Sequence, residues 1–210
     1  MRKIVVSSMI SIDGYTEGAG GDVMAMPMDQ PFSENNVERV RAAGRLLFGG
    51  ITYRGMMQYW PAQVDNPDAS PDDRYIASRY AGGLPITVVS DTLTRDDITV
   101  WCDQTTIVRR ADAHAEIERL RSEGDGASTG GGSADALGRD ILIFGSRTLW
   151  TDLLAHGLVD ELFLMIGPRV VGGDHRAFAG LAGIDLTLLD VRSWQNSGTV
   201  LLHYAAANAR

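Results

Sequence analysis

Residues 141–173 read ILIFGSRTLWTDLLAHGLVDELFLMIGPRVVGG, and this stretch indicates the fold class of the chain. The apolar run Ile141–Phe144 predicts a short buried strand that stops at Gly145-Ser146. Thr148–His156 has the spacing of an amphipathic helix, and Glu161–Ile166 is a second apolar run of strand length. Two strands joined through a helix by short turns are typical of a parallel sheet covered by helices.

The rest of the chain repeats this alternation. Residues 61–73 are polar and rich in proline, which predicts a loop. Ser33 is a possible N-cap for the first helix, and a helix follows Gly49-Gly50. The further predicted strands are Lys3–Met9, Arg45–Phe48, Pro85–Ser90, Ile98–Trp101 and Thr105–Val108, and the further predicted helices are Asn35–Ala43, Arg74–Tyr80 and 112–123. The segments 185–194 and 199–204 predict a C-terminal β-hairpin. We therefore expect an α/β fold with a mixed, mostly parallel sheet and an antiparallel hairpin at its end.

Length and charge restrict the classes of function. We expect one domain over residues 1–210, because 210 residues with 44% hydrophobic content can bury one core, and we interpret the Gly/Ser-rich segment 124–138 as an insertion. A net charge of −8 argues against nucleic acid and anionic membranes as partners. No apolar run has the length of a membrane span or the pattern of a signal peptide, and the single Cys102 fits a reducing compartment, so we expect a cytoplasmic protein.

Three turns predict an anion-binding edge of the sheet. FGGITY (48–53), VSDTLT (89–94) and FGSRTL (144–149) each place small or hydroxyl residues directly after a predicted strand. Glycine lets a phosphate approach the backbone, and the N-terminus of a helix offers free N–H groups to it. From spacing alone each turn is also compatible with a simple tight connection, because neither G-x-G-x-x-G nor the P-loop pattern occurs at these turns.

Four motifs, SMISIDGYTEG (8–18), LLFGGITYRGMMQYW (46–60), ITVVSDTL (86–93) and residues 144–173 of the opening stretch, occur in this order along nearly the whole chain. Together they resemble the dihydrofolate-reductase-like family, in the branch that contains the reductase domain of the bifunctional riboflavin-biosynthesis deaminase/reductase. The resemblance implies bound NADPH and a homodimer. It also implies the following cofactor-binding residues: Met9, Thr16, Gly49, Gly50, Thr52, Tyr53, Ser90, Thr92, Leu93, Gly145, Ser146, Arg147, Thr148 and Leu149.

The sequence departs from the family where the ribose 2′-phosphate of NADPH is expected. Many relatives have Gly-Arg where this chain has Gly49-Gly50, and Asp91 adds a negative charge beside the same site. Arg54 or Arg95 are candidates to compensate. We expect NADPH as the cofactor, with NADH as the alternative.

The resemblance places a catalytic carboxylate at Asp29, with Glu34 as the alternative position. The competing interpretation is that Asp29 is a solvated loop residue and Glu34 a first-turn helix acid. The four histidines show no pair at helical metal-ligand spacing, so the sequence predicts no metal site.

The resulting hypothesis is a reductase that transfers hydride from NADPH to a small planar heterocycle, either a pteridine or a ribosylaminopyrimidine. The alternative hypothesis is a pyridine-nucleotide-binding module without catalysis. The zinc-deaminase motif H-x-E with P-C-x-x-C does not occur in the sequence.

Overall fold

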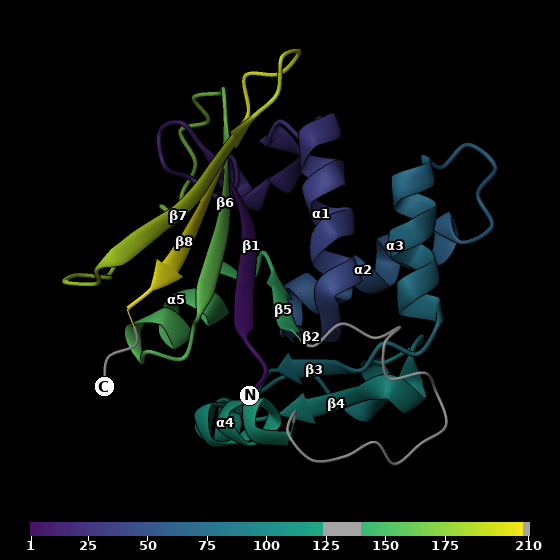
Figure 1. Ribbon diagram of the computed structural model, residues 1–210. Coiled ribbons are helices and arrows are strands. Elements are labelled where there is room, and N and C mark those ends of the chain that lie inside the picture. The colour runs from purple at the N-terminus through teal and green to yellow at the C-terminus, as the bar shows by residue number, and fades with distance from the viewer. Residues whose placement is uncertain (124–139, 208–210) are drawn as a thin grey trace.

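The computed structural model describes residues 1–123 and 140–207, so the predicted insertion at 124–138 lies outside the described residues. Within these residues eight strands form one sheet in the order β4-β3-β2-β5-β1-β6-β8-β7. The strands β1 to β6 pair in parallel, whereas β8 pairs antiparallel with both β6 and β7. The predicted α/β fold with a C-terminal antiparallel hairpin is therefore confirmed (Figure 1).

The strands are β1 (Ile4–Ser11), β2 (Ala43–Gly49), β3 (Ile86–Val89), β4 (Thr105–Val108), β5 (Asp140–Phe144), β6 (Glu161–Gly167), β7 (Leu186–Ser193) and β8 (Val200–Ala206). The helices are α1 (Gln30–Ala42), α2 (Gly50–Gln63), α3 (Pro71–Ala81), α4 (Ala113–Ser122) and α5 (Arg147–Ala155). Short 3-10 turns occur at 19–21, 23–25, 95–97, 102–104 and 110–112. None of the described helices is long and apolar enough to cross a membrane.

The sheet separates two apolar cores. Successive residues of β1 alternate between them, because side chains of a strand point to opposite faces: Val6 belongs to the core that contains Trp150 of α5, whereas Val5 belongs to the core that contains Tyr80 of α3. Trp150 and Tyr80 are both almost fully buried. Helices α1, α2 and α3 lie together on one side of the sheet, as Figure 1 shows, while α4 and α5 contribute to the core on the opposite face.

The first helix begins earlier than the sequence pattern predicts. Helix α1 starts at Gln30 with Asp29 as its N-cap, so Ser33 lies inside the helix and the prediction of Ser33 as the cap is wrong. Pro31 stands in the first turn, where proline is tolerated because no intrahelical partner needs its missing N–H. The Asp29 carboxylate accepts a hydrogen bond from the Phe32 amide at 3.4 Å.

Two further predictions need correction. The proline-rich segment 61–73 is not loop throughout, because α2 continues to Gln63 and α3 begins at Pro71, where Ser70 is the N-cap and accepts from the Asp73 amide at 3.0 Å. Residues 98–101 form no strand. Trp101 has a left-handed backbone with φ of 58°, which is incompatible with continued pairing in a sheet.

Candidate functional site

The three turns predicted to bind an anion meet at one edge of the sheet. Strand β2 lies between β3 and β5, so Gly49-Gly50, Ser90 and Gly145-Ser146 follow three adjacent parallel strands. The Gly49 amide donates a hydrogen bond to the Ser146 hydroxyl at 2.9 Å, which ties the first turn to the third. The carboxyl ends of parallel strands are where open α/β sheets bind their ligands.

Glycine is required here at two positions. A Cβ added at Gly50 would lie 2.7 Å from the Ser90 Oγ and 3.1 Å from the Ser90 Cβ, so only glycine lets these two turns approach each other. Gly145 has φ of +53° and is followed by Ser146 with φ of 54°, so the chain leaves β5 through two left-handed residues. The strand therefore ends in a glycine because its exit needs this backbone conformation.

The helices that follow the two glycine turns have uncapped N-termini. No side chain hydrogen-bonds the first-turn amides of α2 or α5 in the described part of the chain, and their cap positions are Gly49 and Ser146. The first four N–H groups of a helix have no intrahelical acceptor, and the helix dipole adds a partial positive charge there. The two helix starts therefore offer unsatisfied donors on either side of the Gly49–Ser146 hydrogen bond, which suits a diphosphate.

The other residues predicted in these turns fall into two groups. The side chains of Thr148 and Thr92 are exposed, and those of Thr52 and Arg147 are half-buried. The side chains of Tyr53, Leu93 and Leu149 are buried in the core, and the Tyr53 hydroxyl bonds to the Thr105 hydroxyl at 3.0 Å. Because these three side chains are buried under the turns and pack in the core, only their backbone atoms are available to a cofactor.

Ser90 organises the middle turn. Its hydroxyl accepts hydrogen bonds from the amides of Thr92 at 3.3 Å and Leu93 at 3.0 Å, and its side chain is buried. A serine hydroxyl that accepts from the amides two and three residues later fixes a tight turn after the strand. Ser90 therefore shapes the turn, and Thr92 presents its side chain to solvent.

Two arginines outside the predicted set lie beside this turn. Arg109 and Arg110 follow β4, the strand next to β3, so they reach the same edge of the sheet. The Arg109 guanidinium donates to the Ser90 carbonyl at 3.1 Å. The Arg110 amide donates to Asp91 at 3.0 Å, and its guanidinium Nε lies 3.5 Å from the same carboxylate. The charge of Asp91 is thus balanced by Arg110.

The two arginines predicted to compensate for the missing one have other partners. Arg54 pairs with Asp97 at 3.4 Å, and Arg95 donates to the Thr105 carbonyl at 2.9 Å. The signal that could have pointed to Arg109-Arg110 is their position directly after a predicted strand. It becomes informative only when β4 is known to lie beside β3.

The loop after β1 is held by Asp13. Its carboxylate accepts from the Ser11 hydroxyl at 2.6 Å and from the amides of Val171 at 3.1 Å and Gly172 at 2.9 Å. The Ser11 hydrogen bond lowers the pKa of Asp13 most, and the two amides lower it further, to about 2. Asp13 thereby fixes the loop that carries Thr16 against the segment after β6.

Met9 occupies the α1 side of the sheet near the end of β1. Its side chain is buried, and a Cβ added at Gly167 of the neighbouring β6 would lie 3.4 Å from its sulfur. The same added atom would lie 2.3 Å from the Pro27 ring. Close packing of Pro27 on Gly167 brings the segment before α1 over the ends of β1 and β6.

Asp29 joins the start of α1 to the turn of the β7–β8 hairpin. Its Oδ2 accepts from the hydroxyls of Ser197 and Thr199, the latter at 3.0 Å. The Thr199 side chain is fully buried, whereas Asp29 is only partly so. The interpretation of Asp29 as a solvated loop residue is therefore wrong: it is an N-cap with two fixed hydroxyl partners.

Glu34, the alternative carboxylate, is engaged with the hairpin. It accepts from the Trp194 indole at 2.8 Å and pairs with Arg192 at 3.1 Å, while Gln30 donates to its other oxygen at 2.6 Å. The ion pair with Arg192 makes Glu34 a structural link between α1 and β7, whereas the hydrogen-bond donors to Asp29 are all uncharged. Asp29 therefore remains the better candidate for chemistry.

A groove of about 500 Å³ lies elsewhere, on the opposite face of the sheet from Asp29. Its lining includes Ile10, Leu164 and Leu202, which pack with the core that Val6 and Trp150 share. It contains none of the residues of the three turns. Its walls are mainly apolar and hold no catalytic grouping among the described residues, so the predicted chemistry does not belong to it.

The fold also brings together two of the four histidines. The imidazole rings of His114 and His156 have centroids 4.3 Å apart, and the Asp152 carboxylate lies beside both rings. Because His114 and His156 are far apart in the sequence, the spacing of the histidines does not predict this contact.

Comparison with known proteins finds a family model and several solved structures that match almost the whole chain. The family model described as the RibD C-terminal domain matches residues 2–202. An uncharacterised protein of Bacillus subtilis, YyaP, is 24% identical over 97% of this chain and 94% of its own length. The crystal structure of a putative riboflavin biosynthesis protein from Shewanella is similar with a TM-score of 0.68 and 17% identity, covering 98% of this chain and 99% of that one.

A longer relative has two activities in its name. A Thermotoga maritima diaminohydroxyphosphoribosylaminopyrimidine deaminase/5-amino-6-(5-phosphoribosylamino)uracil reductase matches with a TM-score of 0.61 and 11% identity. The match covers 98% of this chain but 57% of that protein. At this level of identity the two structures share a fold.

Proposed function

Because the chain belongs to the RibD C-terminal domain family, we propose that it is a reductase that uses NADPH to reduce a small planar heterocycle. The observation that carries this proposal is the meeting of Gly49-Gly50, Ser90 and Gly145-Ser146 at one sheet edge, with two uncapped helices behind them. This arrangement has the donors and the open backbone that a dinucleotide diphosphate needs.

The cofactor would be held along this edge. The amides at the starts of α2 and α5 would bind the diphosphate, and the turn at Ser90 and Thr92 would hold the adenosine ribose. The loop that Asp13 fixes, with Met9 and Thr16 at its sides, would receive the nicotinamide. When bound, the cofactor supplies the hydride, and the protein contributes position and a proton.

The choice of NADPH over NADH rests on Arg109 and Arg110. These two cations lie at the end of the strand next to Ser90, and Asp91 neutralises only one of them. A guanidinium is well suited to a phosphate because its N–H groups match the phosphate oxygens. The 2′-phosphate of NADPH would thus find here the positive charge that relatives supply at the position of Gly50.

For the proton we propose Asp29. The hydroxyls of Ser197 and Thr199 hold one of its oxygens, and the Phe32 amide holds the other, so the carboxyl group has a fixed position beside the partly buried segment before α1. A fixed carboxyl group near an imine or carbonyl can supply the proton that accompanies hydride transfer. The occupation of both oxygens also favours the second hypothesis, a nucleotide-binding module without catalysis.

The substrate class follows from the family and from the named activity of the Thermotoga relative. A ribosylaminopyrimidine is the first candidate, and a pteridine is the second. The test is a panel of such heterocycles with NADPH, in which consumption of NADPH is followed and the reduced product is identified by mass. Turnover of a member of the panel supports the reductase. Binding of NADPH without turnover of any member supports the module, and the absence of nucleotide binding contradicts both.

We also propose that the chain forms a homodimer through β7. This edge strand exposes Leu188 and Leu189 at 50% and Val191 at 52%, and unpaired apolar edge strands are normally covered. Light scattering of the purified protein should give the mass of two chains, and Leu189→Lys should give the mass of one. A wild-type protein with the mass of one chain would contradict the dimer.

A further inference from the structure

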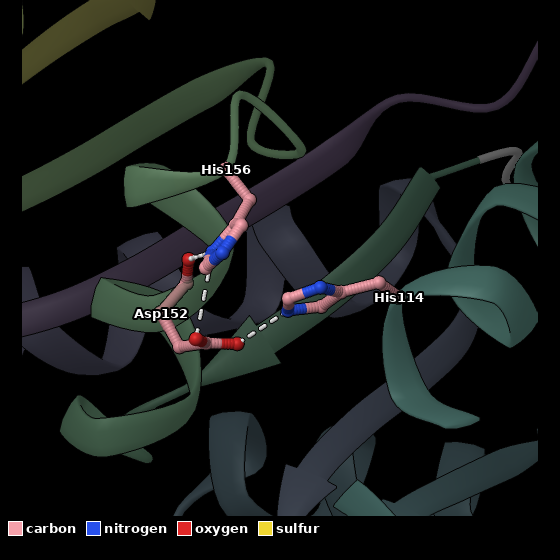
Figure 2. A group of neighbouring side chains, drawn as sticks. All are labelled: His114, Asp152 and His156. Carbon is pink, nitrogen blue, oxygen red and sulfur yellow. Dashed lines mark hydrogen bonds and ion pairs between the residues drawn. The ribbon is translucent and has the colours of Figure 1, made fainter. Parts of the chain in front are cut away.

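We infer a binding site for a divalent transition-metal ion, with Zn²⁺ as the best fit, formed by His114, Asp152 and His156. Among the described residues these three side chains form a group whose ligand atoms all lie within 4.8 Å of one another. The His114 Nε2 lies 2.6 Å from one Asp152 oxygen, and the His156 Nδ1 lies 3.5 Å from the other (Figure 2). All three side chains are 39 to 53% exposed, so an ion can reach them from solvent.

The ligand types and spacing suit this ion. Zn²⁺ binds imidazole nitrogen and carboxylate oxygen at about 2.0–2.2 Å, so ligand atoms around a tetrahedral ion stand roughly 3.3 Å apart. The observed spacings bracket this value, and exposed side chains can make the remaining adjustment by small rotations. Two imidazoles with one carboxylate leave a fourth position for water, and they select Zn²⁺, Ni²⁺ or Co²⁺ over Mg²⁺ or Ca²⁺.

The surroundings leave the carboxylate available to a cation. The ion pairs of Asp152 in the described part of the chain are with the two histidines alone. The ion would take the place of the 2.6 Å hydrogen bond between His114 Nε2 and the Asp152 carboxylate, and it would displace the 2.8 Å contact between His156 Nδ1 and the Asp152 carbonyl. Metal binding should therefore release protons and weaken in acid, because protons compete for these ligands.

The site would join two helices that are distant in sequence. Asp152 lies in the last turns of α5, and His156, four residues later, is the residue that caps the end of this helix. His114 is the second residue of α4 (Figure 2). Helix α5 begins directly after the Gly145-Ser146 turn, and α4 begins shortly after Arg110. The ion would thus tie together the two helices that follow these turns, although its binding does not depend on the proposed function.

The experiment uses the full chain without a histidine tag, stripped of metal with a chelator and titrated with ZnCl₂ by calorimetry. We expect one ion per chain and a rise in the melting temperature at saturating metal. At a hundredfold excess of metal over Kd the rise should be about 5–10 °C. His114→Gln and His156→Gln should each weaken binding by at least about tenfold, because even the loss of an outer partner of a ligand costs that much.

Matched controls separate this site from other metal-binding groups. His175→Gln removes an exposed histidine that also pairs with a carboxylate, Glu17 at 2.6 Å, and it should leave the affinity unchanged. Cys102→Ser removes the exposed thiol and should also have no effect. Failure of Zn²⁺, Ni²⁺ and Co²⁺ to bind would overturn the inference. So would undiminished binding in the His114→Gln/His156→Gln double variant.

Discussion

Gly50→Ala tests the close approach of two turns that the nucleotide site requires. The new Cβ would lie 2.7 Å from the Ser90 Oγ and 3.1 Å from its Cβ, well inside van der Waals contact. Ser90 cannot simply rotate away, because its hydroxyl accepts from the amides of Thr92 and Leu93. The substitution therefore either breaks these hydrogen bonds or pushes the β2 and β3 turns apart.

The size of the effect depends on the interactions around Ser90 that the new methyl group disturbs. Two hydrogen bonds are worth about 1 kcal/mol each, and overpacking of a tight contact costs about 1–3 kcal/mol. Alanine recovers less than about 1 kcal/mol through its higher helix propensity at the start of α2. We expect a net destabilisation of about 1–2 kcal/mol, which lowers the melting temperature by about 2–8 °C. NADPH binding should weaken as well, because the turn moves.

Gly55→Ala is the matched control. It makes the same substitution within the same helix, but a Cβ there would meet no described atom within 4 Å. Alanine in a helix interior is favoured over glycine, so this variant should be more stable by about 0.5–1 kcal/mol. If Gly50→Ala were as stable as Gly55→Ala and bound NADPH normally, the contact between the turns would not matter.

Three further predictions concern the charged residues. Asp29→Asn keeps one acceptor oxygen but loses the other, which accepts from Ser197 and Thr199, and it cannot donate the proton. We expect kcat to fall by about 10²–10⁴-fold and the melting temperature to fall by about 2–4 °C. Normal turnover with only the loss of stability would make Asp29 purely structural. Asp13→Asn should be less stable than wild type at neutral pH. The pKa of Asp13 is lowered from 3.8 to about 2, so the ionised carboxylate stabilises the fold fully above the pKa of the unfolded state. The difference in stability between wild type and Asp13→Asn should therefore vanish as the pH falls from about 4 to 2. A difference that does not depend on pH would contradict the role of the Asp13 carboxylate in holding the loop after β1. Arg110→Ala should weaken NADPH roughly three- to tenfold and leave NADH unchanged, whereas Arg54→Ala should change neither; equal loss of both nucleotides would place the 2′-phosphate elsewhere.

The sequence predicts the elements whose signal is local. Strand β5, the glycine turn and α5 follow from one apolar run, one breaker and one amphipathic segment, and the β7–β8 hairpin follows from two strand patterns around Gln195-Asn196. The ends of helices and strands are predicted less accurately where several start or stop signals lie close together in the sequence. Pro31 obscures the start of α1, and Ser70-Pro71 marks the start of α3 inside a segment whose composition suggests a loop.

Other features arise only from the tertiary arrangement. Arg109-Arg110 reach Ser90 because β4 pairs with β3, and His114 meets His156 because α4 and α5 lie on the same side of the sheet. The family resemblance implies that Tyr53, which follows the glycine turn in the sequence, contacts the cofactor. The helical turn of α2 instead directs its ring into the core. Spacing along the chain carries no information about such contacts.

The most direct test of the account is a calorimetric titration of the wild-type protein and of Gly145→Val with NADPH and NADH. Gly145 has φ of +53°, and a β-branched residue strains this conformation, so valine should displace the start of α5. We predict that wild type binds NADPH more tightly than NADH and that Gly145→Val, shown to be folded by circular dichroism, loses both. Failure of wild type to bind either nucleotide, or equal binding by a folded Gly145→Val, would contradict the central claim that these turns form a pyridine-nucleotide site.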